Sequence, residues 1–216
     1  MALALVILAV ARPQTGQARE IVKGEGVDIA LALDISGSMA SLDFEPQNRL
    51  EAAKAVIDTF VSERQYDQVG LVVFASNAFS QSPPTTDHNV LLRLLDRTKL
   101  ATELGIDDGT AIGMGLANAA NMLKDSDASS RVIILLTDGG ASQEGLSELA
   151  ARLRADGGTL STVGVGQDAA PFLQPLALDG GGRYHYTDNP STIPQIFVQE
   201  TTLAQRAYIV EETFYP

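Results

Sequence analysis

The apolar residues of the chain gather in short, nearly continuous runs, and stretches of helical period separate these runs. Four such runs predict buried strands, at residues 27–33, 69–75, 131–137 and 158–165. Runs of this length without polar alternation are typical of parallel strands that are covered on both faces. Two weaker runs predict an edge strand at 78–81, ended by Pro83 and Pro84, and an outer strand at 183–187.

Apolar residues at helical spacing follow most of these runs. The clearest stripe predicts a helix over 49–61, with Leu50, Ala53, Val56, Ile57, Phe60 and Val61 on one face. Further helices are predicted after a cap at Thr86 or Asp87, at 111–123, at 146–155, at 171–177, and from Pro190 to about Gln205. Strands that alternate with helices predict a doubly wound α/β fold, with a mostly parallel central sheet and helices on both faces.

The chain length of 216 residues favours one domain, which we place at 27–206. Polar, glycine-rich residues at 12–26 predict a linker, and 207–216 predict an extended tail. The apolar segment 1–11 is too short to span a bilayer, which needs about 20 residues. We interpret it as the end of a transmembrane helix; a signal peptide cleaved after Ala11 and an ordinary buried terminal element remain alternatives.

The net charge of −12 limits the partners of the chain more than it limits the fold. Nucleic-acid binding needs a basic face, so we expect no nucleic-acid partner. Most of the acidic excess is expected to form a solvated surface. The absence of cysteine excludes thiolate metal sites, disulfides and cysteine nucleophiles. No pattern in the sequence indicates an oligomeric state.

Polar residues follow two of the predicted central strands at the point where each strand ends. Asp34 ends the first apolar run and is followed by Ser36 and Ser38, while Asp138 directly follows the third run. Thr110 lies in a glycine-rich loop that opens a helix. In doubly wound sheets, ligands bind outside the carboxyl ends of the strands. We therefore expect these five side chains to meet at one edge of the sheet.

The chemistry of this set indicates a divalent cation. All five side chains offer oxygen and none is histidine or cysteine, which selects Mg²⁺, Mn²⁺ or Ca²⁺ over zinc or copper. Because the hydroxyls are neutral, a bound ion stays electrophilic. An open coordination position could then take an Asp or Glu carboxylate from a protein partner, which predicts metal-mediated binding rather than catalysis.

These segments resemble the metal-ion-dependent adhesion site of the von Willebrand factor type A family. The likeness rests on Asp34-Ile-Ser36-Gly-Ser38, on Gly109-Thr110 and on Thr137-Asp138-Gly, and covers roughly residues 27–200. It implies that Ser36, Ser38 and Thr110 touch the metal directly, while Asp34 and Asp138 act largely through water. Mg²⁺ is the favoured ion, with Mn²⁺ and Ca²⁺ as alternatives.

The ends of the chain resemble bacterial membrane-anchored proteins of the same family. The likeness lies in Ala11-Arg-Pro-Gln14 and in the segment from Ile196 to Thr201. It implies a membrane-associated domain in the bacterial cell envelope, and the chain could be a fragment of a longer protein. The sequence does not indicate which side of the membrane the domain faces.

Two other functions compete with binding. A Mg²⁺-dependent phosphatase-like hydrolase would need a basic residue for the phosphate, and the motif loops contain neither lysine nor arginine. A structural domain without ligand is the second alternative. We predict no enzyme.

Several residues near the motifs are interpreted as structural. Four loop acids, Asp43, Glu45, Asp107 and Asp108, could add charge around the metal, but we interpret them as solvated and leave them out of its direct ligands. We interpret His88 and His185 as structural. The aromatic residues Phe79, Tyr184 and Tyr186 are expected to pack rather than bind.

Overall fold

The computed structural model describes residues 21–23, 26–43, 47–64, 66–128, 130–140, 144–166, 171–187 and 209–211. Contacts divide the chain into two units. The small unit holds β1 (Ile21–Lys23) and β8 (Ile209–Glu211), which pair antiparallel. The large unit, residues 25–206, holds everything described below.

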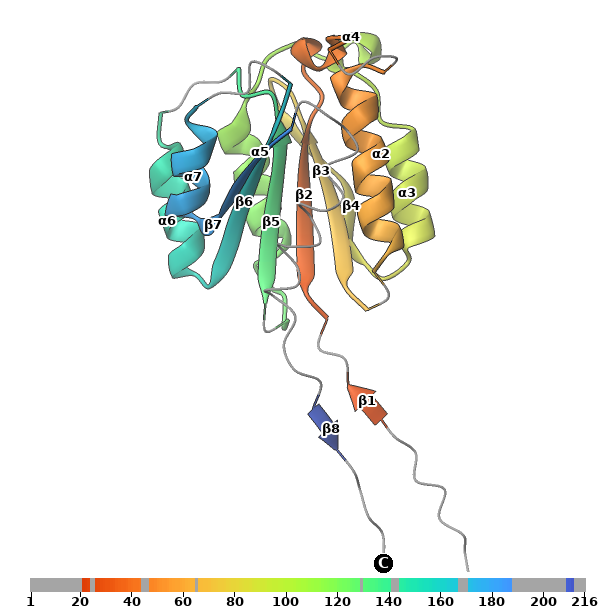
Figure 1. Cartoon of the computed structure of the whole chain (residues 1–216), viewed down its shortest axis with the longest axis vertical. Helices are drawn as coiled ribbons and strands as arrows, with labels where there is room; N and C mark the ends of the chain where they lie inside the picture. Colours follow the sequence, from red (N-terminus) through yellow and green to blue (C-terminus); the bar gives the residue numbers. More distant parts are fainter. Residues whose placement is uncertain are drawn as a thin grey trace, which may run out of the picture. The chain divides into compact units, whose positions relative to one another are not determined.

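A six-stranded sheet forms the centre of the large unit, in the order β4-β3-β2-β5-β6-β7. Its strands are β2 (Asp28–Asp34), β3 (Gln68–Phe74), β4 (Ala78–Thr85), β5 (Arg131–Thr137), β6 (Gly158–Val165) and β7 (Gly181–Thr187). All neighbours pair parallel except β4, which runs antiparallel to β3 at the edge. The carboxyl ends of five strands therefore lie along one edge of the sheet (Figure 1).

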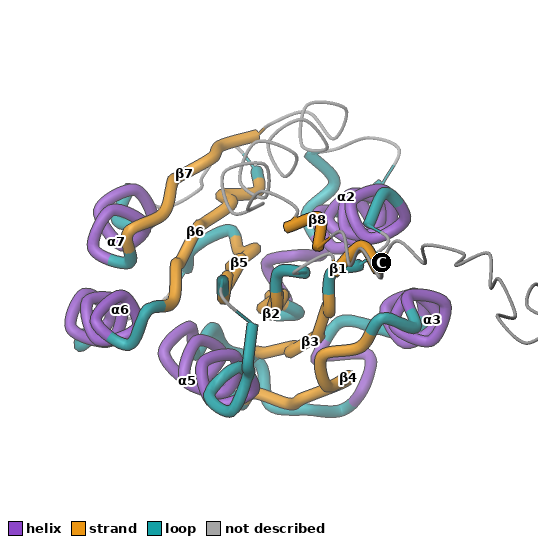
Figure 2. The backbone as a smooth tube through the Cα atoms, turned by 90° about the horizontal axis from the view of Figure 1, so that it is seen from below, coloured by secondary structure: helices purple, strands orange, loops and turns teal. Residues whose placement is uncertain are grey.

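Helices cover both faces of this sheet (Figure 2). One face carries α2 (Arg49–Ser62) and α3 (His88–Asp96), and the other carries α5 (Ile112–Met122), α6 (Leu146–Ala155) and α7 (Leu173–Asp179). Two short helices, η1 (Gly37–Ala40, 3₁₀) and α4 (Ala101–Leu104), lie in the connections. The predicted doubly wound α/β fold is confirmed.

The sequence of β2 explains how the two layers differ. Ile29, Leu31 and Leu33 point into the cluster that includes α2, while Ala30 and Ala32 point into the cluster that includes α5. The small alanines let α5 approach closely, and Gly115 of α5 lies against Phe74 of β3. A Cβ at Gly115 would stand only 2.7 Å from the ring carbon Cδ1 of Phe74. All six predicted stripe residues of the 49–61 helix are buried.

The structure corrects the predicted end of the edge strand. Strand β4 continues through Pro83 and Pro84 to Thr85 instead of ending before them. An edge strand tolerates proline because its outer side needs no N–H donor, and the β3–β4 register shifts beside Gly70. The predicted packing of Phe79 and Tyr186 is also wrong, since both side chains are exposed, whereas Tyr184 packs against the core.

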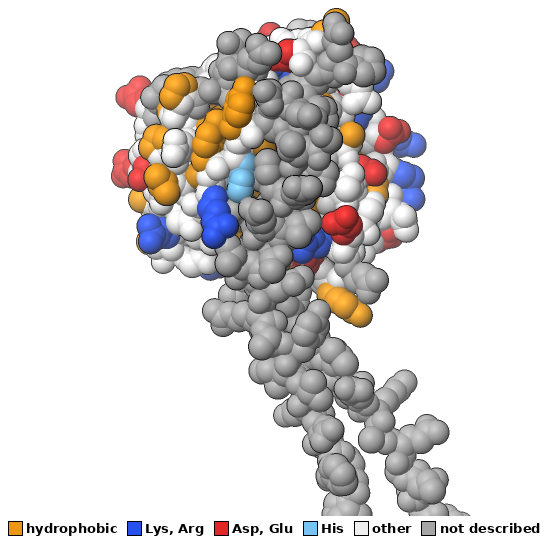
Figure 3. Space-filling view, in the orientation of Figure 1, with side chains coloured by type: hydrophobic (Ala, Val, Ile, Leu, Met, Phe, Trp, Pro, Cys, Tyr) orange, Lys and Arg blue, Asp and Glu red, His pale blue; other side chains and the backbone are white. Residues whose placement is uncertain are grey.

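Some predictions lie outside the described residues. These are the apolar segment 1–11, most of the linker, the helix from Pro190 and most of the tail; the described part of the linker contains β1. Within the part of the chain that the structure describes, no helix has both the length and the apolar character to cross a membrane. On the face drawn in Figure 3, acidic and basic side chains are interspersed, as expected of a solvated surface.

Candidate metal centre

Asp34 is the last residue of β2, and its side chain is fully buried. Its Oδ1 accepts a hydrogen bond from the backbone N–H of Ser36 at 2.8 Å, and its Oδ2 accepts one from the Thr137 hydroxyl at 2.6 Å. Thr137 Oγ1 in turn accepts from the backbone N–H of Gly139 at 3.0 Å. Asp34 therefore shapes its own loop and ties it to the end of β5.

Burial determines the charge state of Asp34. Loss of solvation raises the pKa of its carboxyl from 3.8 to about 6, against the lowering effect of the bonds from Ser36 and Thr137. The nearby charge of Asp138 raises this pKa further. A cation at this edge would favour the ionised carboxylate.

Ser36 and Ser38 place two hydroxyls side by side at the start of η1. Their Oγ atoms lie 3.0 Å apart, with Ser36 buried and Ser38 exposed. Neighbouring oxygens that share an octahedral ion at about 2.1 Å lie about 3.0 Å from each other. The two hydroxyls are hydrogen-bonded to each other at this distance, and the same separation is compatible with two ligands of one small divalent ion.

The second motif loop is fastened to the first through Asp108. Its Oδ1 accepts hydrogen bonds from the backbone N–H groups of Gly37 and Gly109, both at 2.8 Å. A Cβ at Gly37 would stand 2.5 Å from Asp108 Oδ2, so a larger residue here would have to displace the Asp108 side chain. The half-buried Thr110 follows directly and is thereby held at the same edge.

Asp138 follows β5 and is buried. Its Oδ2 accepts a hydrogen bond from Nη1 of Arg49 at 2.9 Å. Its Oδ1 is also buried, yet it has no hydrogen-bond partner among the described residues. A buried carboxylate oxygen without a donor is costly, and a cation or a cation-bound water would satisfy it.

The contacts of three residues at this edge were not predicted from the sequence: those of Arg49, Asp108 and Thr137. The reading of Asp43 and Asp108 as merely solvated acids is wrong, because Asp43 pairs with Arg49 at 2.6 Å and Asp108 joins two loops. Glu45 lies outside the described residues. Helical spacing could have revealed Arg49, which stands on the buried stripe of its helix, four residues before Ala53.

The two histidines lie on α3 and β7, which carry none of the five predicted ligands. His88 opens α3, and its Nε2 lies 3.0 Å from the backbone oxygen of Asp67. His185 lies in β7 at the opposite border of the sheet from β4. Among the described residues, no three His, Asp or Glu side chains form a metal-binding group, so a metal here would depend on the hydroxyls.

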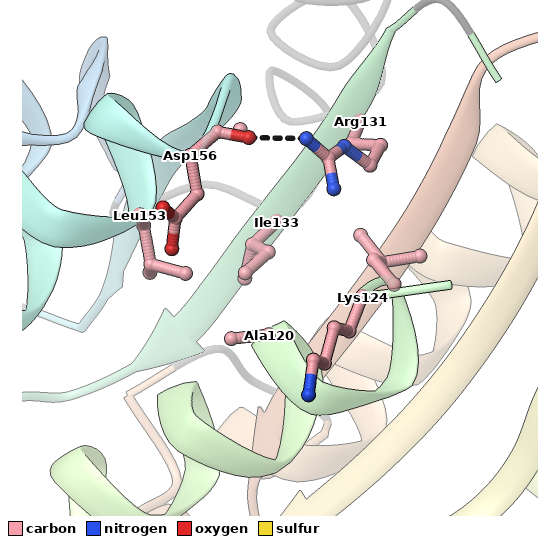
Figure 4. Close-up of a pocket in the computed structure, with 8 residues that line it drawn as sticks. Ala120, Lys124, Arg131, Ile133, Leu153 and Asp156 are labelled. Atoms are coloured by element: carbon pink, nitrogen blue, oxygen red, sulfur yellow. Dashed lines mark hydrogen bonds between the residues drawn. The ribbon is translucent and has the colours of Figure 1, made fainter. Parts of the chain in front are cut away.

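A cavity of about 300 Å³ lies elsewhere, at the amino-terminal edge of the sheet (Figure 4). Ile133 and Leu153 line it together with Lys124, and Arg131 donates a hydrogen bond to the backbone oxygen of Asp156 there. This bond caps the end of α6. Because the cavity lies at the amino-terminal edge of the sheet, it is separate from the candidate metal centre at the carboxyl edge.

Comparison with known proteins identifies relatives in bacteria. The chain is 37% identical over 139 residues to an uncharacterized protein of Borreliella burgdorferi, and 32% identical over 146 residues to a UPF0353 protein of Mycolicibacterium paratuberculosis. Each match covers 64% of this chain, but the chain spans only 40% and 42% of the lengths of these relatives.

Solved structures agree with these matches. BatB from Bacteroides thetaiotaomicron, described as a conserved hypothetical protein, superposes with a TM-score of 0.76 at 30% identity, over 84% of this chain and 100% of that one. An aerotolerance-related membrane protein from Bacteroides fragilis gives 0.74 at 29% identity, over 82% and 100%.

A mussel byssus protein, proximal thread matrix protein 1, shares the fold. It superposes with a TM-score of 0.69 at 21% identity, over 87% of this chain and 48% of that one, and its structure has a zinc-occupied MIDAS motif. The family model of the von Willebrand factor type A domain matches residues 28–199. The chain therefore belongs to the von Willebrand factor type A domain family.

Proposed function

We propose that residues 27–206 form a metal-dependent protein-binding module. Ser36, Ser38 and Thr110 hold a divalent cation directly, and Asp34 and Asp138 hold it largely through bound water. An Asp or Glu side chain of a partner protein completes the coordination. The observation that carries this proposal is the buried Asp138 Oδ1 without a partner, at the edge where two serine hydroxyls lie 3.0 Å apart.

The protein side chains have distinct tasks in this proposal. Asp34 uses both of its oxygens to hold the Ser36 backbone and the Thr137 hydroxyl, so it orients the loop. The serine and threonine hydroxyls supply oxygen without charge. The bound ion supplies a Lewis acid that attracts an external carboxylate. Mg²⁺ is favoured because the hydroxyl separation fits an octahedral ion and the set offers few carboxylates, whereas Ca²⁺ takes six to eight oxygens and commonly uses a carboxylate with both oxygens.

The comparisons support the coarse part of this proposal. Domains of this family are known as metal-dependent adhesion and protein-interaction modules. The zinc in the mussel byssus protein supports a divalent cation on this fold. The ion and the partner carboxylate in this chain rest on its own residues.

We place the domain at a membrane of the bacterial cell envelope, tethered through segment 1–11. The description of the Bacteroides fragilis relative as a membrane protein supports this location. Because the chain spans less than half of its curated relatives, other parts of the whole protein could also contribute to its partners.

Arg49 does not revive the phosphatase alternative. Its Nε and Nη2 contact Asp43 and its Nη1 contacts Asp138, so the guanidinium that a phosphate would need is already engaged by two carboxylates. The site thus offers no basic group for a phosphate among the described contacts. We propose no catalytic activity.

Metal titration by calorimetry on chelator-treated protein tests the proposal. Wild type should bind Mg²⁺ or Mn²⁺ with one site, while Asp34→Ala and Thr110→Ala should bind more than about tenfold more weakly, as expected for loss of groups at or around a metal. Thr59→Ala is the matched control, because that hydroxyl bonds to Ala55 O on an exposed helix surface. Equal binding by all four proteins would reject the proposal.

A second measurement tests the partner carboxylate. An immobilised acidic peptide should retain wild type in the presence of Mg²⁺ and release it with chelator. The same peptide with amidated side chains should not retain it. Asp34-dependent turnover in a phosphatase and hydrolase panel would instead establish an enzyme.

A further inference from the structure

Arg49 forms two ion pairs, one with Asp43 and one with Asp138. Its Nε lies 2.9 and 3.0 Å from the two carboxylate oxygens of Asp43, and its Nη2 lies 2.6 Å from Oδ2. Its Nη1 lies 2.9 Å from Asp138 Oδ2. Only 8% of the side chain is exposed. A planar guanidinium is suited to this fork, which a lysine could not reproduce.

The surrounding backbone fixes the guanidinium in place. Arg49 is the first residue of α2, directly after the capping Asn48, whose side chain accepts a hydrogen bond from the Glu51 backbone N–H. At the end of β6, Gly166 has φ = +91°, and a Cβ there would overlap the guanidinium of Arg49. Arg49 is therefore held from two sides while it contacts Asp138.

This contact divides the two oxygens of Asp138 between different tasks. The Arg49 guanidinium lies at ion-pair distance from Oδ2, so a divalent cation bound to the same oxygen would be repelled by the positive charge of Arg49. Oδ1 remains buried and without a partner. Asp138 can therefore turn one oxygen toward the metal centre, through the bound water proposed above, but it cannot become a ligand that binds the ion with both oxygens.

The number of oxygens that Asp138 can offer affects which ion the centre prefers. Mg²⁺ requires near-ideal octahedral geometry with compact ligands, whereas Ca²⁺ takes six to eight oxygens and commonly uses a carboxylate with both oxygens. We infer that Arg49 is a specificity-determining residue that restricts Asp138 to one oxygen and so discriminates against Ca²⁺ in favour of Mg²⁺, a role that rests on the metal binding proposed above.

The test compares two dissociation constants on the same protein. Calorimetry on chelator-treated full chain gives the ratio of the Ca²⁺ constant to the Mg²⁺ constant for wild type and for Arg49→Met. Loss of the guanidinium should lower this ratio by roughly tenfold or more, on the scale of groups that orient metal ligands. A merely structural Arg49 would weaken both ions alike and leave the ratio unchanged.

Two further variants separate geometry from charge and from folding. Arg49→Met combined with Asp43→Asn removes one positive and one negative charge, so the net charge of the cluster is that of wild type, and Asp138 Oδ2 is still released. Its ratio should fall as in Arg49→Met. Asp43→Asn alone keeps the Arg49–Asp138 contact and should keep the wild-type ratio. Circular dichroism checks that each variant is folded.

Each result has a distinct meaning. An unchanged ratio in the folded double variant overturns the role of Arg49 while leaving the metal site intact. A ratio that falls equally in Asp43→Asn, which keeps the Arg49–Asp138 contact, assigns the effect to loss of the Asp43–Arg49 pair and also overturns the proposed role. Absence of any Mg²⁺ or Ca²⁺ binding by wild type overturns the proposed metal site itself.

Discussion

The two edges of the central sheet use carboxylates in opposite ways. At the amino-terminal edge, Asp67 accepts from the Val27 backbone N–H at 2.9 Å and pairs with Arg64 at 3.5 Å. Asp28 accepts from the Ser126 hydroxyl at 2.5 Å. At the carboxyl edge, by contrast, Asp138 keeps one buried oxygen without a partner among the described residues.

We interpret the difference as one between structural carboxylates and a carboxylate that the proposed cation would satisfy. Asp67 and Asp28 join the start of β2 to its neighbours, so their hydrogen bonds are part of the folded structure. The carboxyl edge instead combines a fully buried Asp34 with an unsatisfied oxygen of Asp138, which destabilises the domain unless something binds. Such local instability is a common companion of function.

The largest expected effect comes from removing the charge of Asp34. The pKa of its carboxyl rises from 3.8 to about 6 on folding, chiefly because burial removes solvation. Folding is therefore favoured by this group below pH 3.8 and loses that contribution as the pH rises to about 6. At pH 7 without metal, Asp34→Asn should be more stable than wild type by up to about 3 kcal/mol, at 1.36 kcal/mol per pKa unit.

Urea unfolding of both proteins from pH 3.5 to 7.5 measures this difference. The advantage of the asparagine variant should grow between pH 4 and about 6 and level off above, because the Asp34 carboxyl is then ionised in both the folded and the unfolded protein. Added Mg²⁺ should reduce it by stabilising only wild type. A constant difference across the whole pH range would show that folding does not raise the pKa of the Asp34 carboxyl.

A pair of hydroxyl deletions compares the two edges directly. Thr137→Val removes the donor to Asp34 Oδ2 and should destabilise the domain by about 2 kcal/mol, because that oxygen is fully buried. Ser126→Ala removes the donor to the less deeply buried Asp28 and should cost about 1 kcal/mol.

Metal affinity distinguishes these two variants more sharply than stability does. Thr137→Val should weaken Mg²⁺ binding by roughly tenfold, since it releases a carboxylate that shapes the metal loop. Ser126→Ala should leave the affinity at the wild-type value. Calorimetry on both proteins measures this, and an equal loss in both would remove the contrast between the edges.

The smallest expected effect concerns Asp108, which is exposed. Asp108→Ala removes an acceptor shared by the backbone N–H groups of Gly37 and Gly109, and water can replace it. We expect a loss of about 0.5–1 kcal/mol in unfolding free energy. Thermal unfolding measures it, and Asp107→Ala is the matched control because only the Asp107 backbone oxygen accepts a bond, from Ser76.

The fold could be predicted from the sequence because its determinants are local. Apolar runs located β5 and β6 to the residue, and one helical stripe located α2. The strand ends then indicated where Asp34 and Asp138 would lie, since parallel strands share one carboxyl edge. The continuation of β4 through Pro83 and Pro84 was missed, because only the finished sheet shows that this strand lies at its border.

The polar partners at the metal centre depend on contacts between distant segments. Arg49 and Asp138 are 89 residues apart, and Gly37 and Asp108 are 71 apart. A pattern of helical period shows that Arg49 faces inward but does not name the carboxylates that neutralise it. The oxygen of Asp138 that remains without a partner depends on which oxygen Arg49 contacts, and the predicted ligand roles depend on it too.

The central place of β2 also determines when the metal centre can form. Within β2, Leu33 pairs with Val73 on one side and with Leu136 on the other, and the bond from Thr137 to Asp34 joins residues 103 apart. Pairings over such distances form slowly, because chain entropy must be lost before they add stability. A cation that binds only the completed centre therefore slows unfolding and leaves the refolding rate nearly unchanged. The ion would prolong the lifetime of the folded domain rather than guide its formation.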